Sequence, residues 1–460
     1  MTAADRCQAP PVSIDHPDEA ADPARESEKS LRRAGSLWRH RDFLLLWGGQ
    51  AVSEVGSSIS YLAMPLIAVT LIRATTFEVS VLSVLSSLAF LLLALPAGVV
   101  VDRYRKRGMM LGCDAARMVL MFSIPLAAIV WHVTLWQLYV VAAAVGILTV
   151  FFDVAYQSYL PALVDTDQLA DGNGKLGTTQ SFAQVVGPSL GGLLVTLMGV
   201  ARAVVTDAAS YLVSTVSLAF IRTAEPEPRR ADGKERVPFR AAMGEGLSFV
   251  VKHPILRKVV ACTGSSNFFS SMLGAIEVVF LVRTLHATSA QVGLLFALGS
   301  TGGILGGLFS GRISRAVGNA RIIWVSMIVP APVYLLIPLA QPRWGLLMFA
   351  VGNFAFSSSA VVYNVAQVTY RQSICPPELL GRMNASVRWI VWGTMPLGAL
   401  AGGGLGTWIG LRPTIFASVI GGTLAALFVF FSPLRHMRDF PADPDPVGLV
   451  ALEEAAPSGS

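Results

Sequence analysis

Long apolar segments, separated by short polar or charged ones, make up the sequence from residue 43 onward. A helix of about 20 apolar residues is long enough to cross a hydrocarbon core of about 30 Å. Each of these segments reaches that length, so the pattern predicts twelve transmembrane helices. They are expected at residues 43–71, 77–101, 108–131, 134–156, 176–198, 202–221, 257–282, 289–310, 321–340, 344–366, 385–408 and 411–432.

The polar segments divide the chain into five parts. We predict a disordered N-terminal tail (1–42), a six-helix half (43–221), a cytoplasmic central loop (222–256), a second six-helix half (257–432) and a disordered C-terminal tail (433–460). The first tail has no apolar core of the kind that marks a signal peptide. The predicted fold class is therefore an all-α membrane protein with two parallel six-helix repeats.

The basic residues predict the orientation of this bundle. Of 35 Lys and Arg residues, five lie singly in the loops on one side, two lie within helices, and the other 28 lie on the side of the termini. The five are Arg73, Arg202, Arg283, Arg343 and Arg412, and the two are Arg117 and Arg388. Positive residues accumulate on the cytoplasmic side of membrane proteins. We therefore predict a multi-pass protein of the cell membrane with both termini in the cytoplasm.

The overall composition agrees with a membrane protein. Hydrophobic residues make up 53% of the chain and charged residues 14%, whereas soluble domains carry about 25% charged residues. The net charge of +6 reflects orientation, so we infer no nucleic-acid partner. The four cysteines show no metal-site spacing and no disulfide framework, and we predict no metal.

The two halves repeat one another at a nearly constant offset. Asp153-Val-Ala aligns with Asn364-Val-Ala, and Gly187, Gly191 and Gly192 align with Gly398, Gly402 and Gly403, all 211 residues apart. Because each half has an even number of helices, the repeat is parallel, about an axis along the membrane normal. That geometry suits a transporter whose halves rock around a central site.

Residues 98–107 read GVVVDRYRKR at the end of the second predicted helix. Here the chain resembles the major facilitator superfamily, whose loop between helices 2 and 3 reads GxxxDRxGRR. The matching residues are Gly98, Asp102, Arg103, Lys106 and Arg107, whereas Arg105 replaces a glycine. The resemblance implies that Asp102 meets the positive N-terminus of a helix from the other half and latches the outward-facing state, and Gly98 would permit close helix approach. Alternatively, the basic residues only anchor the loop at the inner leaflet.

Asp114 and Arg117 follow in the third predicted helix. An acid and a base three residues apart face one another on a helix, so we expect them to pair. Together with the basic loop they resemble the drug:proton antiporter branch that includes macrolide and siderophore exporters. We interpret them as support for the latch.

A second motif lies in the fifth predicted helix, where Gly174 is followed by Gly187-Pro188 and Gly191-Gly192. It resembles the antiporter signature of the same superfamily, G-x8-G-x3-GP-x2-GG, with Ala183 in place of one glycine. Small residues in this register let helices pack closely, and proline bends the helix. The resemblance implies exchange rather than cotransport, although ordinary small-residue packing would give the same pattern.

Residues 172–177 spell GNGKLG, but no strand precedes this segment, so a dinucleotide site is not indicated. The chain also has no GxxxxGK[ST] motif for nucleotide hydrolysis. We therefore expect no cofactor and a proton gradient as the source of energy.

Glu54 is the charge most deeply placed in a predicted helix. It lies eleven residues into the first span, about 16 Å along the helix and close to the bilayer midplane. Ionisable residues at that depth are rare and functional. We predict that Glu54 carries a proton or binds a cationic group, and the alternative is a carboxyl group satisfied by neighbouring helices.

Four further intramembrane charges are candidates. Asp153 and Arg388 both lie near the inner ends of their helices, in different halves, and we predict that they form a state-dependent gate. Asp207 and Glu277 lie toward the outer side and are expected to receive protons from outside, unless they are simply solvated.

These features predict a monomeric secondary transporter that exchanges protons for a bulky, amphipathic small molecule within membrane lipid. Trp47 and Tyr61 are among the aromatic residues that can line its cavity, although single aromatic residues often face lipid. The alternatives are a proton-coupled importer of the same fold and a non-transporting sensor or scaffold. No nucleophile–base pair or metal cluster is evident, so we do not expect an enzyme.

Overall fold

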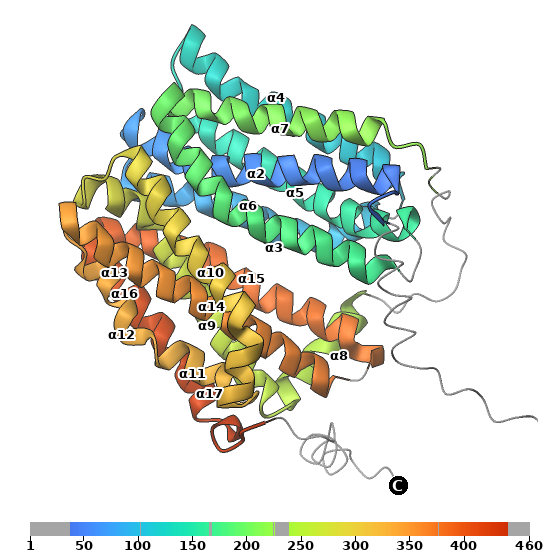
Figure 1. Cartoon of the computed structure of the whole chain (residues 1–460), viewed down its shortest axis with the longest axis vertical. Coiled ribbons are helices and arrows are strands. Elements are labelled where there is room, and N and C mark those ends of the chain that lie inside the picture. The colour runs from blue at the N-terminus through green and yellow to red at the C-terminus, as the bar shows by residue number, and fades with distance from the viewer. Residues whose placement is uncertain are drawn as a thin grey trace, which may run out of the picture.

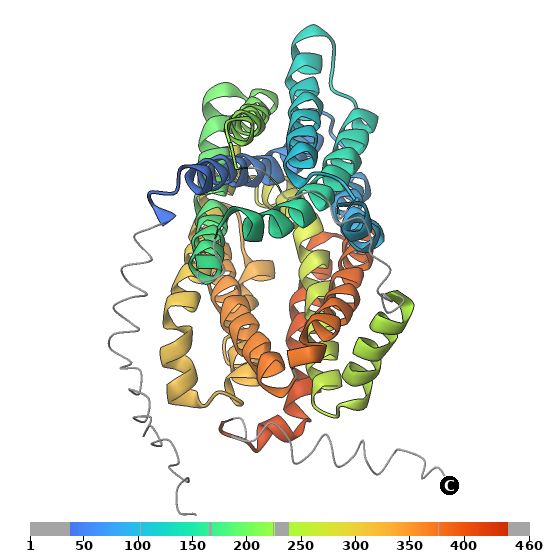
Figure 2. The ribbon, with the colours of Figure 1, turned by 90° about the vertical axis from the view of Figure 1, so that its right-hand side faces the viewer.

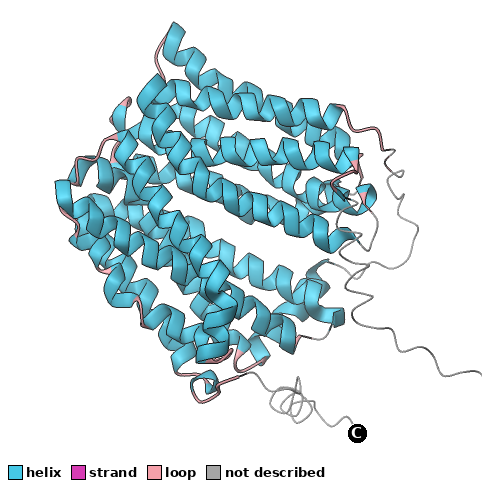
Figure 3. Ribbon diagram, viewed as in Figure 1, coloured by secondary structure: helices cyan, strands magenta, loops and turns pink. Residues whose placement is uncertain are grey.

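The computed structural model describes residues 37–101, 103–164, 168–223, 225, 239–375 and 377–439. Within these ranges the chain is helical, and they contain no β-strand (Figure 3). The predicted all-α fold is confirmed. Most of both predicted tails, and Asp102 of the loop motif, lie outside the described residues.

The first half contains six long helices. They are α2 (Arg41–Thr70), α3 (Thr76–Val101), α4 (Lys106–Val130), α5 (Leu135–Leu163), α6 (Leu169–Met198) and α7 (Val200–Ala219). Local capping fixes several of their starts. For example, the Thr134 side chain accepts a hydrogen bond from the Gln137 backbone N–H at the start of α5.

The second half follows the same order with more interruptions. Its elements are α9 (Leu256–Val279) with the π-helix η2 (Phe280–Thr284), α10 (Ser289–Val317), α11 (Ile322–Ile328), α12 (Ala331–Tyr334), α13 (Leu336–Leu339), η3 (Arg343–Gly345), α14 (Leu346–Ile374), α15 (Pro377–Trp408), α16 (Leu411–Leu424), α17 (Ala426–Phe430) and η4 (Pro433–Arg435).

Part of the segment predicted as a central loop is helical. Residues Phe239–Lys252 form α8, which packs on α15 and α9. Val250 of α8 is buried in one apolar cluster with Leu256 and Val387. This burial against the second half explains why the segment is helical although it is too short and polar to cross a membrane.

Nine helical spans in the described chain are long and apolar enough to cross a membrane. They comprise α2, α3, α4, α5, α9 with η2, α10, α11–α13, α14 and α16–α17. The other three predicted spans coincide with α6, α7 and α15. In α6 the apolar stretch found among the described residues is Val186–Met198, whereas α7 and α15 contain more Gly, Ser and Thr, which lower their hydropathy.

The two groups of helices lie side by side as two bundles (Figures 1 and 2). The first bundle meets the second mainly where α3 packs on α15 and α6 packs on α10, with smaller contacts from α2 and α3 to α9. The long helices run roughly along one direction, and the described residues nearest both chain ends lie at the same end of the bundle (Figure 1). We call this end the terminal end and the other the distal end.

The repeat seen in the sequence recurs in the backbone. Gly199, between α6 and α7, has φ of 86°, and Gly410, between α15 and α16, has φ of 92°. The two residues are separated by the repeat offset of 211. A positive φ is accessible to glycine at little cost, so each half uses glycine for the same tight connection.

The two halves touch closely at the distal end. A Cβ atom built on Gly192 of α6 would lie 2.6 Å from the Cα of Gly293 in α10, and one built on Gly403 of α15 would lie 2.6 Å from the Cβ of Ser80 in α3. These two contacts are related by the repeat. Arg283 adds a hydrogen bond to the carbonyl oxygen of Ala74 across the same boundary. We refer to the four residues Ser80, Gly192, Gly293 and Gly403 as the distal seal.

Candidate functional site: a cavity between the two halves

A cavity of about 1220 Å³ lies between the two halves. Its walls come from α2 to α7 of the first half and from α9, α10 and α15 of the second. Trp47 and Asn173, which line it, are close to the terminal-end starts of α2 and α6, whereas Glu277 and Ala399 lie deeper. The cavity therefore extends from the terminal end toward the distal seal.

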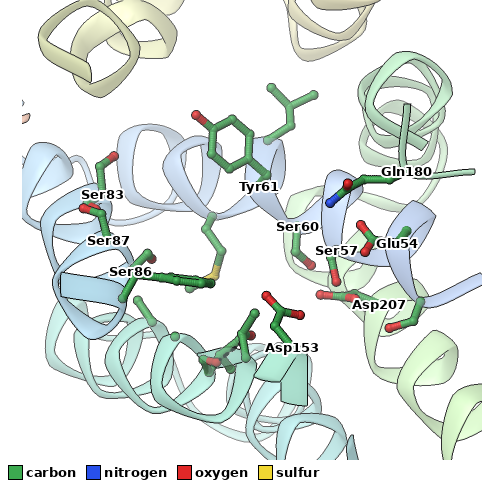
Figure 4. Close-up of a pocket in the computed structure, with 18 of the residues that line it drawn as sticks. Glu54, Ser57, Ser60, Tyr61, Ser83, Ser86, Ser87, Asp153, Gln180 and Asp207 are labelled. Atoms are coloured by element: carbon green, nitrogen blue, oxygen red, sulfur yellow. Dashed lines mark hydrogen bonds between the residues drawn. The ribbon is translucent and has the colours of Figure 1, made fainter. Parts of the chain in front are cut away.

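Three carboxylates of the first half share one region of this cavity. Glu54 is on α2, Asp153 on α5 and Asp207 on α7, and all three line the cavity. Figure 4 shows their side chains directed toward a common region, beside Ser57 and Ser60. The sequence predicted Glu54 as a central site, but it did not predict that Asp153 and Asp207 would lie close to it.

Glu54 lies near the middle of the thirty-residue helix α2. The Gln50 amide, one turn earlier, donates a 2.9 Å hydrogen bond from Nε2 to Glu54 Oε1. This neutral donor orients the carboxyl group without supplying a counter-charge. Glu54 is thus held in place while remaining able to exchange a proton or meet a cationic group.

Asp207 is held where α2 and α7 pack closest. The Ser210 hydroxyl donates to Asp207 Oδ1 at 3.3 Å, and a Cβ atom built on Gly56 would lie 2.9 Å from the same oxygen. Glycine at position 56 therefore permits the approach that brings Asp207 to the cavity wall.

The Asp114–Arg117 ion pair predicted from the i, i+3 spacing is present and buried in the first half. The Arg117 guanidinium lies over the Phe152 ring, 4.3 Å from its centroid, and 4.7 Å from the centroid of Tyr211. Arg117 also lines the cavity. These contacts are with α5 and α7 rather than with the loop before α4, so in this conformation the Arg117 guanidinium, neutralised by Asp114, forms part of the cavity wall.

Replacing Arg117 with Leu is expected to reduce the free energy of unfolding by about 3–5 kcal/mol, because Asp114 would remain as an unpaired buried charge. The double variant Asp114→Leu/Arg117→Leu removes both charges and should be more stable than the single variant. Thermal unfolding in detergent measures the difference. A double variant as unstable as Arg117→Leu would contradict this account of the pair.

Lys106 and Arg107 of the loop motif contact the end of α7 and the segment that follows it. The backbone N–H groups of Lys106 and Arg107 donate to the two carboxylate oxygens of Glu225, at 2.7 and 3.2 Å. The Lys106 ammonium lies 3.7 Å from Glu225. Arg107 donates to the carbonyl oxygens of Leu218 and Ala219 at the end of α7. Glu225 thus caps α4, while Arg107 caps α7.

Sequence reasoning missed Glu225 and a similar contact of Asp42. The Asp42 carboxylate accepts hydrogen bonds from the backbone N–H groups of Arg222 and Thr223. Both acids attach the segment after α7 to the terminal end of the first half. The signal available was an acidic residue after the sixth apolar span, opposite a basic loop.

Replacing Glu225 with Ala should speed hydrogen exchange at the Lys106 and Arg107 amides roughly fivefold, because a lost cap costs about 1 kcal/mol. Glu225→Gln retains one acceptor oxygen and should give a smaller increase. Hydrogen exchange followed by mass spectrometry measures both. Unchanged exchange in Glu225→Ala would contradict the capping role.

Two motif glycines have no close neighbour in this conformation. Nothing lies within 4 Å of a Cβ atom built on Gly98 or on Gly174. The close helix approach predicted at Gly98 is therefore not formed here, since the halves contact one another at the distal rather than the terminal end. Arg103, which follows Asp102, is exposed.

The rest of the antiporter motif packs as predicted for small residues. A Cβ atom on Gly187 would overlap Ser58 of α2, and one on Gly191 would lie 3.4 Å from the Ile59 Cα. Gly192 faces α10 of the other half instead. Pro188 lies within α6 between these contacts and lines the cavity. This stretch of α6 therefore joins its own half to the distal seal.

The two candidate charges of the second half line the cavity at different depths. Glu277 of α9 is buried, and its Oε1 has no hydrogen-bond partner among the described residues. Arg388 of α15 lies over the Trp392 ring, 4.9 Å from its centroid. Among the described ion pairs there is none between Arg388 and Asp153. The predicted gate pair is therefore not formed in this conformation, although both residues line the same cavity.

Comparisons with known proteins agree with this architecture. A sequence profile described as Major Facilitator Superfamily matches residues 46–393 and 259–455. The chain is 24% identical over 397 residues to macrolide efflux protein A of Streptococcus pyogenes, covering 85% of this chain and 95% of that protein. It is also 24% identical over 420 residues to enterobactin exporter EntS of Citrobacter koseri, covering 89% and 96%.

A solved structure is similar in fold. It is a bacterial homologue of the human lysosomal transporter Spinster, in an inward-facing and unoccupied conformation. The TM-score is 0.63 at 16% sequence identity, over 85% of this chain and 96% of that one. This similarity concerns the arrangement of helices alone.

Proposed function

This chain belongs to the Major Facilitator Superfamily, and on that premise we propose that it exports a bulky amphipathic compound across the cell membrane in exchange for protons. It is a multi-pass membrane transporter and not an enzyme. The proposal concerns the direction of transport, the coupling ion and the kind of substrate.

One observation carries the proposal: Glu54 faces a cavity of about 1220 Å³ at the middle of α2, and Asp153 and Asp207 line the same region. Carboxyl groups within a membrane are costly and generally functional. A carboxyl group that binds a proton in one conformation and releases it in the other couples the proton gradient to the rocking of the halves.

The closed distal seal and the opening toward the termini represent one of the two conformations that alternating access requires. If both termini are cytoplasmic, as the basic residues predict, this is the inward-facing conformation. Substrate then enters from the cytoplasm, displaces a proton from the carboxylate region, and leaves on the distal side after the seal opens. The two halves, 43–221 and 257–432, act as the rocking units.

The relatives support export and a large substrate. Macrolide efflux protein A and the enterobactin exporter are named for the export of bulky compounds. The cavity also presents apolar and aromatic surface, including Trp47 and Tyr61, in addition to the carboxylates. A macrolide and enterobactin are therefore suitable first probes. A proton-coupled importer of the same fold is the second candidate.

Inverted membrane vesicles containing the protein test the direction of exchange. The vesicles are first acidified inside. When a transported compound is added outside, we expect it to accumulate inside the vesicles while protons leave them. Vesicles without the protein serve as the control. Movement of compound and protons in the same direction would overturn antiport in favour of the importer.

A further inference from the structure

A second cavity lies on the outer surface of the second half, between α9 and α16–α17. It is a groove of about 490 Å³ and shares no lining residue with the central cavity. Small residues form its floor, namely Ser265, Gly421 and Ala425. Its sides include Leu424 and Phe428, which are 53% and 48% exposed. In a membrane this surface faces lipid.

The groove lies where the last transmembrane segment, α16 followed by α17, runs past α9. Helix α16 ends at Leu424 and α17 begins at Ala426. At the deep end of the groove, the Phe269 ring lies against Gly421, where a Cβ atom would meet its Cδ1 at 2.7 Å. Because position 421 has no side chain, the Phe269 ring packs against the backbone there and closes the groove at this end.

The other end of the groove carries positive charge. The Lys258 ammonium donates a 2.6 Å hydrogen bond to the carbonyl oxygen of Phe431, just beyond α17. An ammonium group has three donors, so two remain for a ligand. Arg257 is exposed beside it, and the Arg435 guanidinium lies over Phe430, 4.6 Å from the ring centroid. Segment 252–258 contains no acidic residue, and in segment 431–439 the one acidic residue, Asp439, lies 3.9 Å from the Arg438 guanidinium.

The length of the groove matches one leaflet of a membrane. Lys258 and Phe269 are eleven residues apart on α9, which corresponds to about 16 Å along the helix. Half of a hydrocarbon core is about 15 Å. A chain lying in the groove would therefore run from the headgroup level, at Lys258, to near the centre of the bilayer, at Phe269.

We propose that this groove binds one anionic phospholipid of the leaflet on the side of the termini. Lys258 holds the phosphate, and one acyl chain lies over Ser265 and against Phe269 and Phe428. The basic residues at this end, Arg257, Lys258 and Arg435, favour an anionic over a zwitterionic headgroup, since basic pockets at this level attract anionic lipids. The site goes beyond the proposed transport function and does not depend on it.

Native mass spectrometry of the full chain in detergent tests this site. The protein is mixed with equal amounts of phosphatidylglycerol and phosphatidylcholine with identical acyl chains. We expect one retained phosphatidylglycerol, favoured about fivefold over phosphatidylcholine. Lys258→Gln should abolish this preference, whereas Arg315→Gln, a matched loss of charge on α10, should retain it. Equal retention of the two lipids by the unaltered protein would overturn the proposal.

Lys258 also holds the end of α17, so a second variant keeps it intact. Ser265→Leu fills the floor of the groove and should reduce retention of both lipids while Lys258 remains. If both Lys258→Gln and Ser265→Leu retain as much phosphatidylglycerol as the unaltered protein, this groove is excluded as the site. The measurement contains no transported compound, so its failure is distinct from failure of the proposed export.

Discussion

Replacing Glu54 with Gln is expected to abolish accumulation of substrate against its gradient, while the protein still inserts and folds. Gln cannot release a proton, so a cycle that exchanges a proton for substrate at this position loses its driving force. Across a gradient of two pH units, one-to-one exchange supports a concentration ratio of up to roughly 100-fold. For Glu54→Gln we expect a ratio of about 1, since only passive equilibration remains.

Proteoliposomes with an imposed pH gradient and a transported compound measure this ratio. Glu78→Gln is the matched control, because it makes the same change at a half-buried carboxylate that does not line the cavity. The Gln side chain keeps an oxygen to accept the hydrogen bonds from Thr75 at the start of α3, so this variant should accumulate substrate normally. Asp207→Asn should be less affected than Glu54→Gln, because Asn can still accept the hydrogen bond from Ser210. A pH-dependent ratio close to 100 in Glu54→Gln would assign proton coupling to another residue.

Much of the fold was predictable because lipid imposes simple requirements on a sequence. A membrane helix needs a long apolar segment and little else, so each predicted span overlaps an observed helix or, at 321–340, a run of three short ones. Helices α5, α6, α14 and α15 extend seven or eight residues beyond the predicted spans at the terminal end. The internal repeat could also be recognised in the sequence, since glycines such as Gly192 and Gly403 recur where helices must approach closely. The helix α8 was not predicted, because its stability comes from packing on α15, which depends on tertiary structure.

The site was predictable only in part because it depends on how helices are rotated. The depth of Glu54 follows from counting residues along one helix. That Asp153 and Asp207 line the same region depends on the facing of α5 and α7 and on the approach permitted by Gly56. The spacing of Asp114 and Arg117 correctly predicted their ion pair. It could not show that the Arg117 side chain points toward the cavity instead of the loop before α4, because contacts with Phe152 and Tyr211 on other helices set that direction. Glu225 lies beyond any regular element, so no periodicity indicated its contact with α4.

The distal seal gives the second large prediction: Gly403→Leu should hold the distal end open and stop transport. Gly403 packs so closely on Ser80 that a side chain requires α15 and α3 to separate. Overlap of this kind costs about 1–3 kcal/mol, which shifts the ratio of two conformations roughly 5- to 150-fold. Because the contact joins the two halves, each half should still fold. Gly293→Leu should act in the same way at the repeat-related contact with Gly192.

Adjacent glycines provide the control for this variant. Nothing lies within 4 Å of a Cβ atom built on Gly404, so Gly404→Leu makes the same change one residue along α15 without an overlap. Spin labels at His132→Cys and Gln341→Cys, in a background lacking the four native cysteines, report the separation of the halves at the distal end. We expect a longer distance and lost transport in Gly403→Leu, and unchanged values in Gly404→Leu. If Gly403→Leu transports normally and its spin-label distance is unchanged, this contact does not determine closure of the distal end. If Gly403→Leu and Gly404→Leu have equal effects, the loss of transport comes from a change in helix α15 itself and not from the distal seal.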